Sequence, residues 1–277
     1  MSQMLLRNIC STSGIRSRNT RSAFRVRLTD RVCTPARARQ RAERHVHHQP
    51  RTPQPPNPIH TSRRIIWPFI GANGLVFLWW TDARMRLDRG RHAEPDDFSH
   101  YEGIKYMLDN YTLNMKNLRE GRWYTILSST ISHINLAHLV FNMISFNAFT
   151  RCAVEIAGLR APTILLLGLG SAVASGGASI LNWYRKGTYD AGCLGASGVV
   201  SGIGAAMACI VPNQPFNILF IPVGIPLWVL MVGYITYDSY GLSHPEKSNI
   251  GHAAHLGGAA FGVLYYVFGF RLRLRRR

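Results

Sequence analysis

The chain has 277 residues, a formal charge of +18 at neutral pH, and 47% hydrophobic residues. A soluble domain with this charge would suggest a nucleic-acid partner, but the charge is concentrated at the two ends. The first 64 residues hold fourteen arginines against two acidic residues, and five arginines close the chain. The middle is nearly neutral and apolar. The composition therefore favours a membrane protein with two basic ends, and argues against a nucleic-acid partner.

Residues 1–61 have no apolar periodicity and are rich in Arg, Ser, Thr and Pro. An arginine-rich, serine-containing and acid-poor N-terminus is typical of a mitochondrial transit peptide. A disordered basic tail held at anionic lipid or nucleic acid is the alternative. We expect a disordered targeting segment at 1–61 and a basic tail at 271–277, on a multi-pass protein of the mitochondrial inner membrane.

Runs without Asp, Glu, Lys or Arg mark the candidate membrane spans. A helix needs about 20 residues to cross a hydrocarbon core about 30 Å thick. The uncharged run at 191–237 is about twice that length, and Pro212-Asn213-Gln214-Pro215 divides it as a turn. The sequence therefore predicts an all-α membrane protein with six transmembrane helices. They lie at about 65–81, 126–149, 161–184, 194–211, 216–237 and 250–270.

The first predicted helix is short and contains Pro68, and a long polar connection follows it at 82–122. A connection of this length usually holds structure of its own or a function. The other connections are short. No internal repeat is evident, which argues against a transporter built from inverted repeats.

The second predicted helix carries three polar side chains, His133, His138 and Asn142. His138 and Asn142 are four residues apart, so they lie on one face of a helix. An imidazole and an amide there could donate hydrogen bonds to an oxyanion. Hydrogen bonds to neighbouring helices are the alternative.

The fourth predicted helix opens with Gly195-Ala196-Ser197-Gly198 and is short. From Ser197 to Pro212 it covers about 15 residues, or roughly 22 Å, which is less than the thickness of a bilayer. We therefore expect a submerged N-terminus with unpaired N–H groups, where the helix dipole favours negative charge. Such a site suits a tetrahedral oxyanion. Taken alone, small residues in a membrane helix more often serve close packing.

The fifth predicted helix contains Pro222-Val223-Gly224-Ile225-Pro226, which should weaken or bend it, and a polar loop at 238–249 follows. A bent helix beside the site could move aside to admit a substrate helix from the lipid. A static bent helix is the alternative.

The sixth predicted helix places His255 at a depth similar to that of Ser197. An ionisable group at this depth usually faces a polar cavity. The fourth and sixth helices carry glycines at a spacing that allows close approach, Gly198 and Gly202 on one and Gly258 and Gly262 on the other. Their contact would bring His255 within reach of the Ser197 hydroxyl, as an activated nucleophile requires. Because no Asp or Glu lies within a predicted span, a Ser–His dyad is predicted rather than a triad.

Metal chemistry is disfavoured. A metalloprotease using His133, His138 and His255 would lack both an HExxH motif and an acidic ligand within a span. The five cysteines show no paired spacing, so neither a disulfide framework nor a zinc ribbon is indicated. No metal or cofactor is expected.

Together, these segments resemble the rhomboid family of intramembrane serine proteases. The matching motifs are His133-x4-His138-x3-Asn142, Gly195-Ala196-Ser197-Gly198 and Ala254-His255-Leu256-Gly257-Gly258-x3-Gly262. Their order and spacing agree with the family over residues 62–270. The second and third motifs look most like the mitochondrial, presenilin-associated branch.

The resemblance implies a six-helix core at 62–270 with a short, submerged fourth helix. It also implies that the protein cleaves transmembrane segments of single-pass proteins in the lipid bilayer. Ser197 would be the nucleophile and His255 the general base. His138, Asn142 and the Ser197 N–H would form the oxyanion hole. Structural positions near the site would be His133, Gly195, Gly198, Gly258 and Gly262. A catalytically silent rhomboid-like protein that binds transmembrane helices is the alternative.

Two departures from the family stand out. The tyrosine often found one turn after the nucleophile is Ser201 in this sequence. Mitochondrial members usually carry an additional helix before the core, and residues 1–60 hold no candidate for it.

Overall fold

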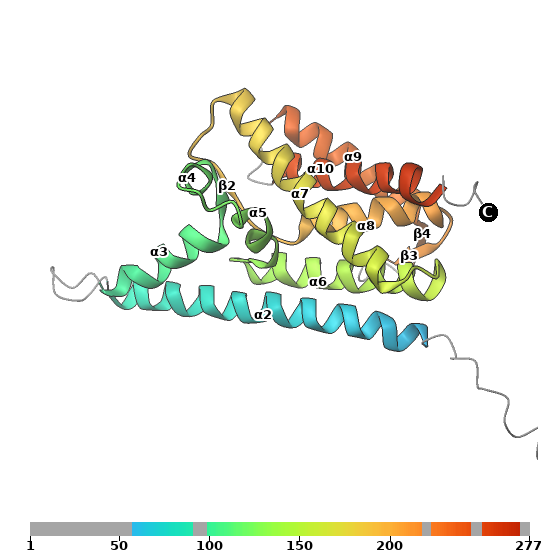
Figure 1. The fold of residues 1–277 in the computed structure, drawn as a ribbon, viewed down its shortest axis with the longest axis horizontal. Helices are drawn as coiled ribbons and strands as arrows, with labels where there is room; N and C mark the ends of the chain where they lie inside the picture. The colour runs from blue at the N-terminus through green and yellow to red at the C-terminus, as the bar shows by residue number, and fades with distance from the viewer. Residues whose placement is uncertain (1–56, 91–98, 218–222, 245–250, 272–277) are drawn as a thin grey trace, which may run out of the picture. The chain divides into compact units, whose positions relative to one another are not determined.

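The computed structural model describes residues 57–90, 99–217, 223–244 and 251–271, and these residues are mainly helical (Figure 1). They belong to one compact unit, Pro55–Arg277. The predicted targeting segment at 1–61 and the basic tail at 271–277 lie almost entirely outside the described residues, so both stay predictions.

The first helix, α2 (Pro58–Gly90), is longer at both ends than the predicted span at 65–81. It runs alongside α6 (Leu136–Arg151) in Figure 1, and the two helices are in contact. The predicted end at Thr81 is wrong because charged residues continue the helix rather than stop it. Asp82 and Arg86 form an ion pair with a spacing of four residues, which supports an exposed helical turn.

The connection at 82–122 holds structure of its own, as predicted. Its elements are α3 (Ser99–Tyr111), β1 (Leu113–Asn114) and α4 (Met115–Arg119), followed by α5 (Thr125–Ser128) and the 3-10 turn η1 (Ser129–Ile131). α3 packs on α2. β1 pairs antiparallel with β2 (Gly192–Cys193), with Leu113 opposite Cys193. This pairing ties the connection to the segment that leads to Ser197.

The predicted helix at 126–149 is broken in the middle. Residues 132–135 are not helical, and α6 begins only after Asn135. The side chain of Asn135 accepts a hydrogen bond from the His138 N–H at 3.1 Å, and this cap starts a new helix. His133 therefore precedes the helix, whereas His138 and Asn142 lie on it. A π-helical turn, η2 (Cys152–Ile156), follows α6.

Helix α10 (His252–Leu264) packs against both α7 (Ala161–Lys186) and α8 (Ser197–Ile210) and ends in a π-helical segment, η4 (Tyr265–Arg271). A methyl group added to Gly258 would lie 2.0 Å from the Gly198 carbonyl oxygen. One added to Gly262 would lie 2.1 Å from the Gly202 carbonyl oxygen. The predicted close contact between these two helices is confirmed.

The predicted fifth helix at 216–237 is wrong at both ends. Strands β3 (Pro215–Asn217) and β4 (Gly224–Pro226) pair antiparallel, and α9 (Leu227–Ser243) follows them. The helix begins directly after Pro226 because a proline within it would remove a backbone hydrogen bond. Most of the described part of the segment predicted to bend a helix is therefore strand β4, preceded by a bend at Val223, and Pro222 lies outside the described residues. α9 packs on α8 and α10, and it carries Asp238 within the helix rather than in a loop.

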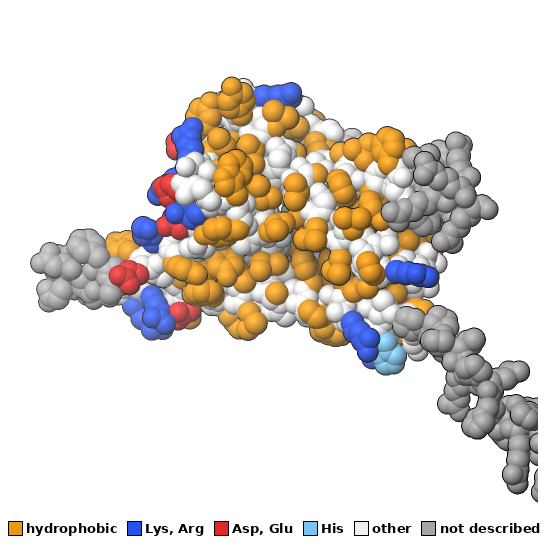
Figure 2. Space-filling model, viewed as in Figure 1, with side chains coloured by type: hydrophobic (Ala, Val, Ile, Leu, Met, Phe, Trp, Pro, Cys, Tyr) orange, Lys and Arg blue, Asp and Glu red, His pale blue; other side chains and the backbone are white. Residues whose placement is uncertain are grey.

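Of the described helices, α7 alone is both long and apolar enough to cross a bilayer, while α8 is a shorter apolar helix of 14 residues. The count of six spans therefore stays a prediction. Figure 2 shows hydrophobic side chains over the middle of the visible face, with charged side chains at its edges. Leu165, Leu166 and Leu169 of α7 are each more than half exposed. Extended exposed apolar surface marks contact with a membrane or another protein.

Candidate active site

Ser197 is the first residue of α8, and a sharp turn at Gly195 presents it. Gly195 has a φ of +126°, which side-chain-bearing residues rarely adopt. Its N–H donates to the Ser129 carbonyl oxygen at 2.8 Å. A methyl group at this position would also lie 2.6 Å from the His138 ring. Glycine is thus required here both for the turn and for the space that the histidine occupies.

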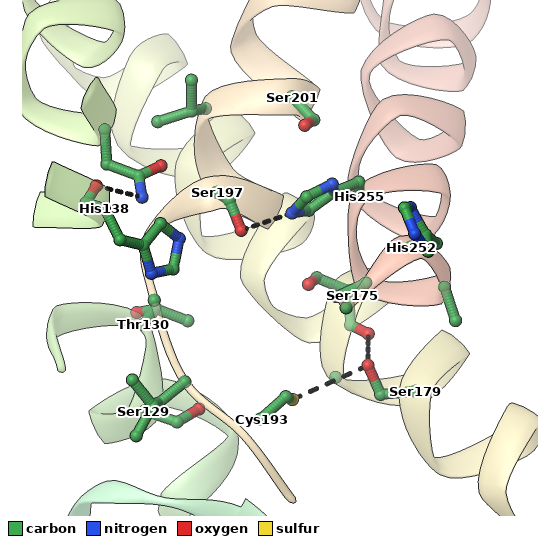
Figure 3. A pocket seen from close by; sticks show the side chains of 18 of the residues that line it. Ser129, Thr130, His138, Ser175, Ser179, Cys193, Ser197, Ser201, His252 and His255 are labelled. Atoms are coloured by element: carbon green, nitrogen blue, oxygen red, sulfur yellow. Dashed lines mark hydrogen bonds between the residues drawn. The ribbon is translucent and has the colours of Figure 1, made fainter. Parts of the chain in front are cut away.

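The hydroxyl of Ser197 and the imidazole of His255 are directly hydrogen-bonded. The Oγ–Nε2 distance is 2.7 Å, and Figure 3 shows the two side chains pointing toward one another from α8 and α10. This distance lies within the range required for a base to take a proton from a nucleophile. The structure therefore brings the two predicted catalytic residues together.

Asp238 of α9 lies on the other side of His255. Its Oδ1 accepts hydrogen bonds from the Nδ1 of His255 at 3.0 Å and from the Nδ1 of His252 at 2.8 Å. An ionised carboxylate can only accept, so each Nδ1 carries a proton. The Nε2 of His255 is then the acceptor that faces Ser197. A carboxylate therefore reaches the pair, contrary to the prediction of an unsupported dyad.

Asp238 was missed because it was placed at the start of a loop. The uncharged run ends at Tyr237, and a charged residue at that point predicts the end of a membrane helix. The available signal was the three-residue spacing of His252 and His255, which puts two imidazoles on one helix face and calls for a shared partner.

His133, His138 and Asn142 lie on the opposite side of Ser197. The fully buried His133 accepts hydrogen bonds at Nε2 from the Ala196 N–H at 3.3 Å and from the Asn142 amide at 3.2 Å. It therefore joins α6 to the residue before Ser197, which is a structural role. In Figure 3 the His138 ring lies beside Ser197 on the side away from His255.

The donors available to an oxyanion differ in part from those predicted. Asn142 also donates to the His138 carbonyl oxygen at 2.9 Å, so both of its amide protons are used in this conformation. α8 begins without a side-chain cap, and its first N–H groups lack an intrahelical partner. The Ser197 N–H and the His138 ring are therefore the better-placed donors.

A cavity of about 1180 Å³ surrounds the pair and extends between α6 and α9. Leu230, Met231 and Tyr234 line it on the α9 side. Hydroxyl groups make much of the remaining wall polar; they belong to Ser129, Thr130, Ser145, Ser175, Ser179 and Ser201. The wall is thus part apolar and part polar, and a cavity of this size has room for both a peptide segment and the water that hydrolysis consumes.

One cluster of described residues has the composition of a metal site, and it is not the predicted alternative. The ligand atoms of Asp238, His252 and His255 lie within 4.8 Å of one another. Two hydrogen bonds to the shared Oδ1 already account for this grouping. His133 and His138 are not in this cluster; their rings meet edge to face at 5.0 Å.

Comparison with known proteins identifies the family of this chain. A family model described as the Rhomboid domain matches residues 120–272. An uncharacterized mitochondrial rhomboid protein of Schizosaccharomyces pombe is 25% identical over 74% of this chain and 63% of its own length. The mitochondrial presenilin-associated rhomboid-like protein of Homo sapiens is 31% identical over 80% of this chain and 52% of its own. The rat protein of that name is 28% identical over the same shares of the two chains.

The chain spans about half the length of the presenilin-associated relatives that it matches. The matched region contains every motif that led to the resemblance, from His133 to Gly262. The chain belongs to the rhomboid family of membrane proteins.

Proposed function

We propose that this chain is an intramembrane serine protease, with Ser197 as the nucleophile and His255 as the general base. The observation that carries the proposal is the 2.7 Å hydrogen bond between Ser197 Oγ and His255 Nε2 at the uncapped start of α8. A silent rhomboid-like protein that only binds transmembrane helices would have no need of this bond.

The geometry supports acyl transfer in two steps. His255 Nε2 takes the hydroxyl proton as Ser197 Oγ attacks the scissile carbonyl carbon, and then gives that proton to the leaving amine. A water molecule in the cavity next loses a proton to His255 and attacks the ester. The proton returns to Ser197 as the ester breaks, which restores both groups.

The oxyanion of each tetrahedral intermediate would be held by the Ser197 N–H, with His138 as the second donor. Donors that are aimed in advance at developing charge stabilise the transition state in a water-poor site. The dipole of α8 acts in the same direction. Asn142 becomes a third donor only if its amide releases one of its present acceptors.

The substrates proposed are transmembrane segments of single-pass proteins, admitted from the lipid bilayer between α6 and α9. The cavity reaches both helices, and Phe141 and Tyr234, each more than half exposed, stand at its two sides. A scissile bond must leave helical geometry to meet Ser197. Small or helix-destabilising residues near the cut should therefore favour cleavage.

The proposed setting is the mitochondrial inner membrane, with a targeting segment at 1–61, a six-span core at 62–270 and a basic tail at 271–277. The named relatives are mitochondrial. Helix α8, at 14 residues, is about 21 Å long, shorter than a hydrocarbon core of about 30 Å. Its N-terminus would thus lie below the membrane surface.

The test is cleavage of a single-pass substrate by purified protein in detergent, together with labelling by a fluorophosphonate probe. Ser197→Ala should abolish both, and His255→Ala should abolish cleavage. Ser239→Ala is the control, because this exposed serine on α9 bonds only its own helix at the Ile235 carbonyl. Cleavage that survives in Ser197→Ala, or folded wild-type protein that neither labels nor cleaves, rejects the proposal.

The compartment is tested separately. Full-length protein tagged at its C-terminus should enter isolated mitochondria in a manner that depends on the membrane potential and resist carbonate extraction. Removal of residues 1–61 should prevent import. Import of the truncated protein would show that this segment is not the targeting signal.

A further inference from the structure

Asp238 is a buried acid in an otherwise uncharged helix. It is the only Asp, Glu, Lys or Arg in α9, and it is 4% exposed. Buried carboxylates are rare unless they are paired, and one inside a membrane segment is costly enough to mark a functional position. The partners of this carboxylate therefore indicate its role.

Both described partners come from one face of α10. His252 and His255 are three residues apart, one turn along the helix, and both Nδ1 atoms point to the same carboxylate oxygen. His255 also faces Ser197, whereas His252 is 4% exposed and lies on the side away from the nucleophile (Figure 3). The carboxylate is thus held between one catalytic and one non-catalytic imidazole.

α9 is shaped to receive His252. Gly241 lies one turn beyond Asp238, and a methyl group there would lie 2.1 Å from the His252 Nε2. The ring of Tyr237 meets the His252 ring nearly edge-on at 5.5 Å. The space left at Gly241, the ring of Tyr237 and the hydrogen bond to Asp238 together hold the His252 ring in one place.

We infer that Asp238 is the positioning residue of the active site and that His252 in turn holds Asp238. The four side chains form a continuous series, Ser197–His255–Asp238–His252, in which each member is hydrogen-bonded to the next. This inference rests on the proposed protease function. Asp238 fixes the Nδ1–H tautomer of His255, which leaves Nε2 unprotonated and directed at Ser197.

The proton balance is simple. When His255 accepts the Ser197 proton it becomes a cation, and the Asp238 carboxylate beside it stabilises that cation without taking up a proton. His252 keeps donating its Nδ1–H to the same carboxylate. Asp238 does not line the cavity, so it acts through His255.

The arrangement also limits how α9 can move. The cavity-lining Met231 precedes Asp238 by seven residues, about 10 Å along the helix. Displacement of the whole helix would withdraw the carboxylate from His255 and stop the chemistry. Substrate admission is therefore compatible with movement of the N-terminal end of α9, while the Asp238 end stays fixed to α10.

The first test is Asp238→Asn, which keeps the side-chain size and removes the charge. We expect kcat to fall about 100-fold or more, with KM for a transmembrane substrate little changed. Asp82→Asn on α2 is the matched control, because that carboxylate is exposed and pairs with Arg86 away from the cavity. Wild-type kcat in Asp238→Asn would overturn the inference.

A spectroscopic measurement separates this inference from the protease proposal. In ¹⁵N-histidine-labelled Ser197→Ala protein, which is inactive by design, the His255 Nδ1–H should give a strongly deshielded proton resonance. Adding Asp238→Asn should remove that resonance. Its presence would support the hydrogen bond even if the protein cleaves nothing; persistence of the resonance in Asp238→Asn would overturn the assignment.

A pair of His252 variants tests the outer member and remains informative if Asp238→Asn does not fold. His252→Asn keeps an N–H donor near the Nδ1 position, whereas His252→Leu removes it. A hydrogen bond to a charged group is strong enough that we expect about a tenfold loss of kcat in the Leu variant and less than about threefold in the Asn variant. Equal activity in the two variants would overturn the role of His252.

Loss of wild-type activity with a chelator, restored by Zn²⁺, would instead make Asp238, His252 and His255 a metal site and overturn the inference.

Discussion

At the site, helix α10 contacts α8 and α9 in two different ways. Against α8 it presents backbone: Gly258 and Gly262 lie so close to carbonyl oxygens of α8 that no side chain fits between. Against α9 it presents two imidazoles, which bind one carboxylate. The first contact fixes how far His255 is from Ser197, and the second fixes which way its ring faces.

This difference shows how distance and orientation can be controlled separately. A backbone contact has no torsion that can relax, so an added atom must push the helices apart. A hydrogen bond can be made by another donor at the same place. Adding atoms at the α8–α10 contact should therefore affect catalysis more than replacing the His252 donor at the α9–α10 contact.

Among changes to the helix contacts that leave Ser197, His255 and Asp238 in place, the largest effect is expected for Gly258→Leu. Even a methyl group would overlap the Gly198 carbonyl oxygen at 2.0 Å, so the helices must separate. A displacement of about 1 Å can lower a rate about 100-fold, and a leucine requires more. The matched control is Gly177→Leu on the exposed side of α7, where nothing lies within 4 Å. Cleavage rates and thermal unfolding in detergent are measured for both variants. Near-normal turnover in Gly258→Leu would refute the helix contact.

A reversible crosslink should have the next largest effect, because it tests whether α9 moves. In a background without native cysteines, Phe141→Cys on α6 and Tyr234→Cys on α9 would be joined by a bifunctional thiosulfonate. Cleavage of transmembrane substrates should largely stop and return with reductant, while the small fluorophosphonate should still label Ser197. The same cysteines modified by a monofunctional reagent are the control. Undiminished cleavage with the crosslink in place would exclude admission between these helices.

A smaller effect is expected for Gly241→Ala. The added methyl group would displace the His252 ring, loosen Asp238 and lower kcat about tenfold, in line with the loss of one charge-assisted hydrogen bond. Gly233→Ala, on the same helix with nothing within 4 Å, is the control. Combining Gly241→Ala with His252→Asn restores room and should recover part of the loss. Additive losses in the double variant would contradict the proposed contact.

Local signals predicted much of the fold. α7 was expected at 161–184 and is found at Ala161–Lys186, because Pro162 favours its start and Gly187, in a left-handed conformation, ends it. The contact of α8 with α10 followed from glycine spacing. The break before α6 and the pairing of β3 with β4 were not predicted, because an uncharged run alone does not show where a helix stops. Caps and prolines, rather than charges, set those boundaries.

The sequence predicted only those site residues that stand out from their neighbours in the chain. Ser197 and His255 are polar groups in apolar helices and were found for that reason. Asp238 was not, because a charged residue at the end of an apolar run looks like a helix end. Its burial depends on partners 14 and 17 residues later in the chain. Likewise, nothing local indicated that the Asn142 amide is already engaged by His133.

The buried carboxylate also bears on how the chain is assembled. In the proposed mitochondrial setting the chain is imported with its N-terminus first, so α9 reaches the membrane before α10, and until α10 follows, Asp238 has neither imidazole partner. A lone acidic residue disfavours insertion of a helix by up to about 2.5–3.5 kcal/mol at its centre, and by less toward its end. Arrival of His252 and His255 relieves this penalty. The last two helices should therefore enter the bilayer as a hairpin, and a chain truncated before α10 should leave α9 poorly inserted.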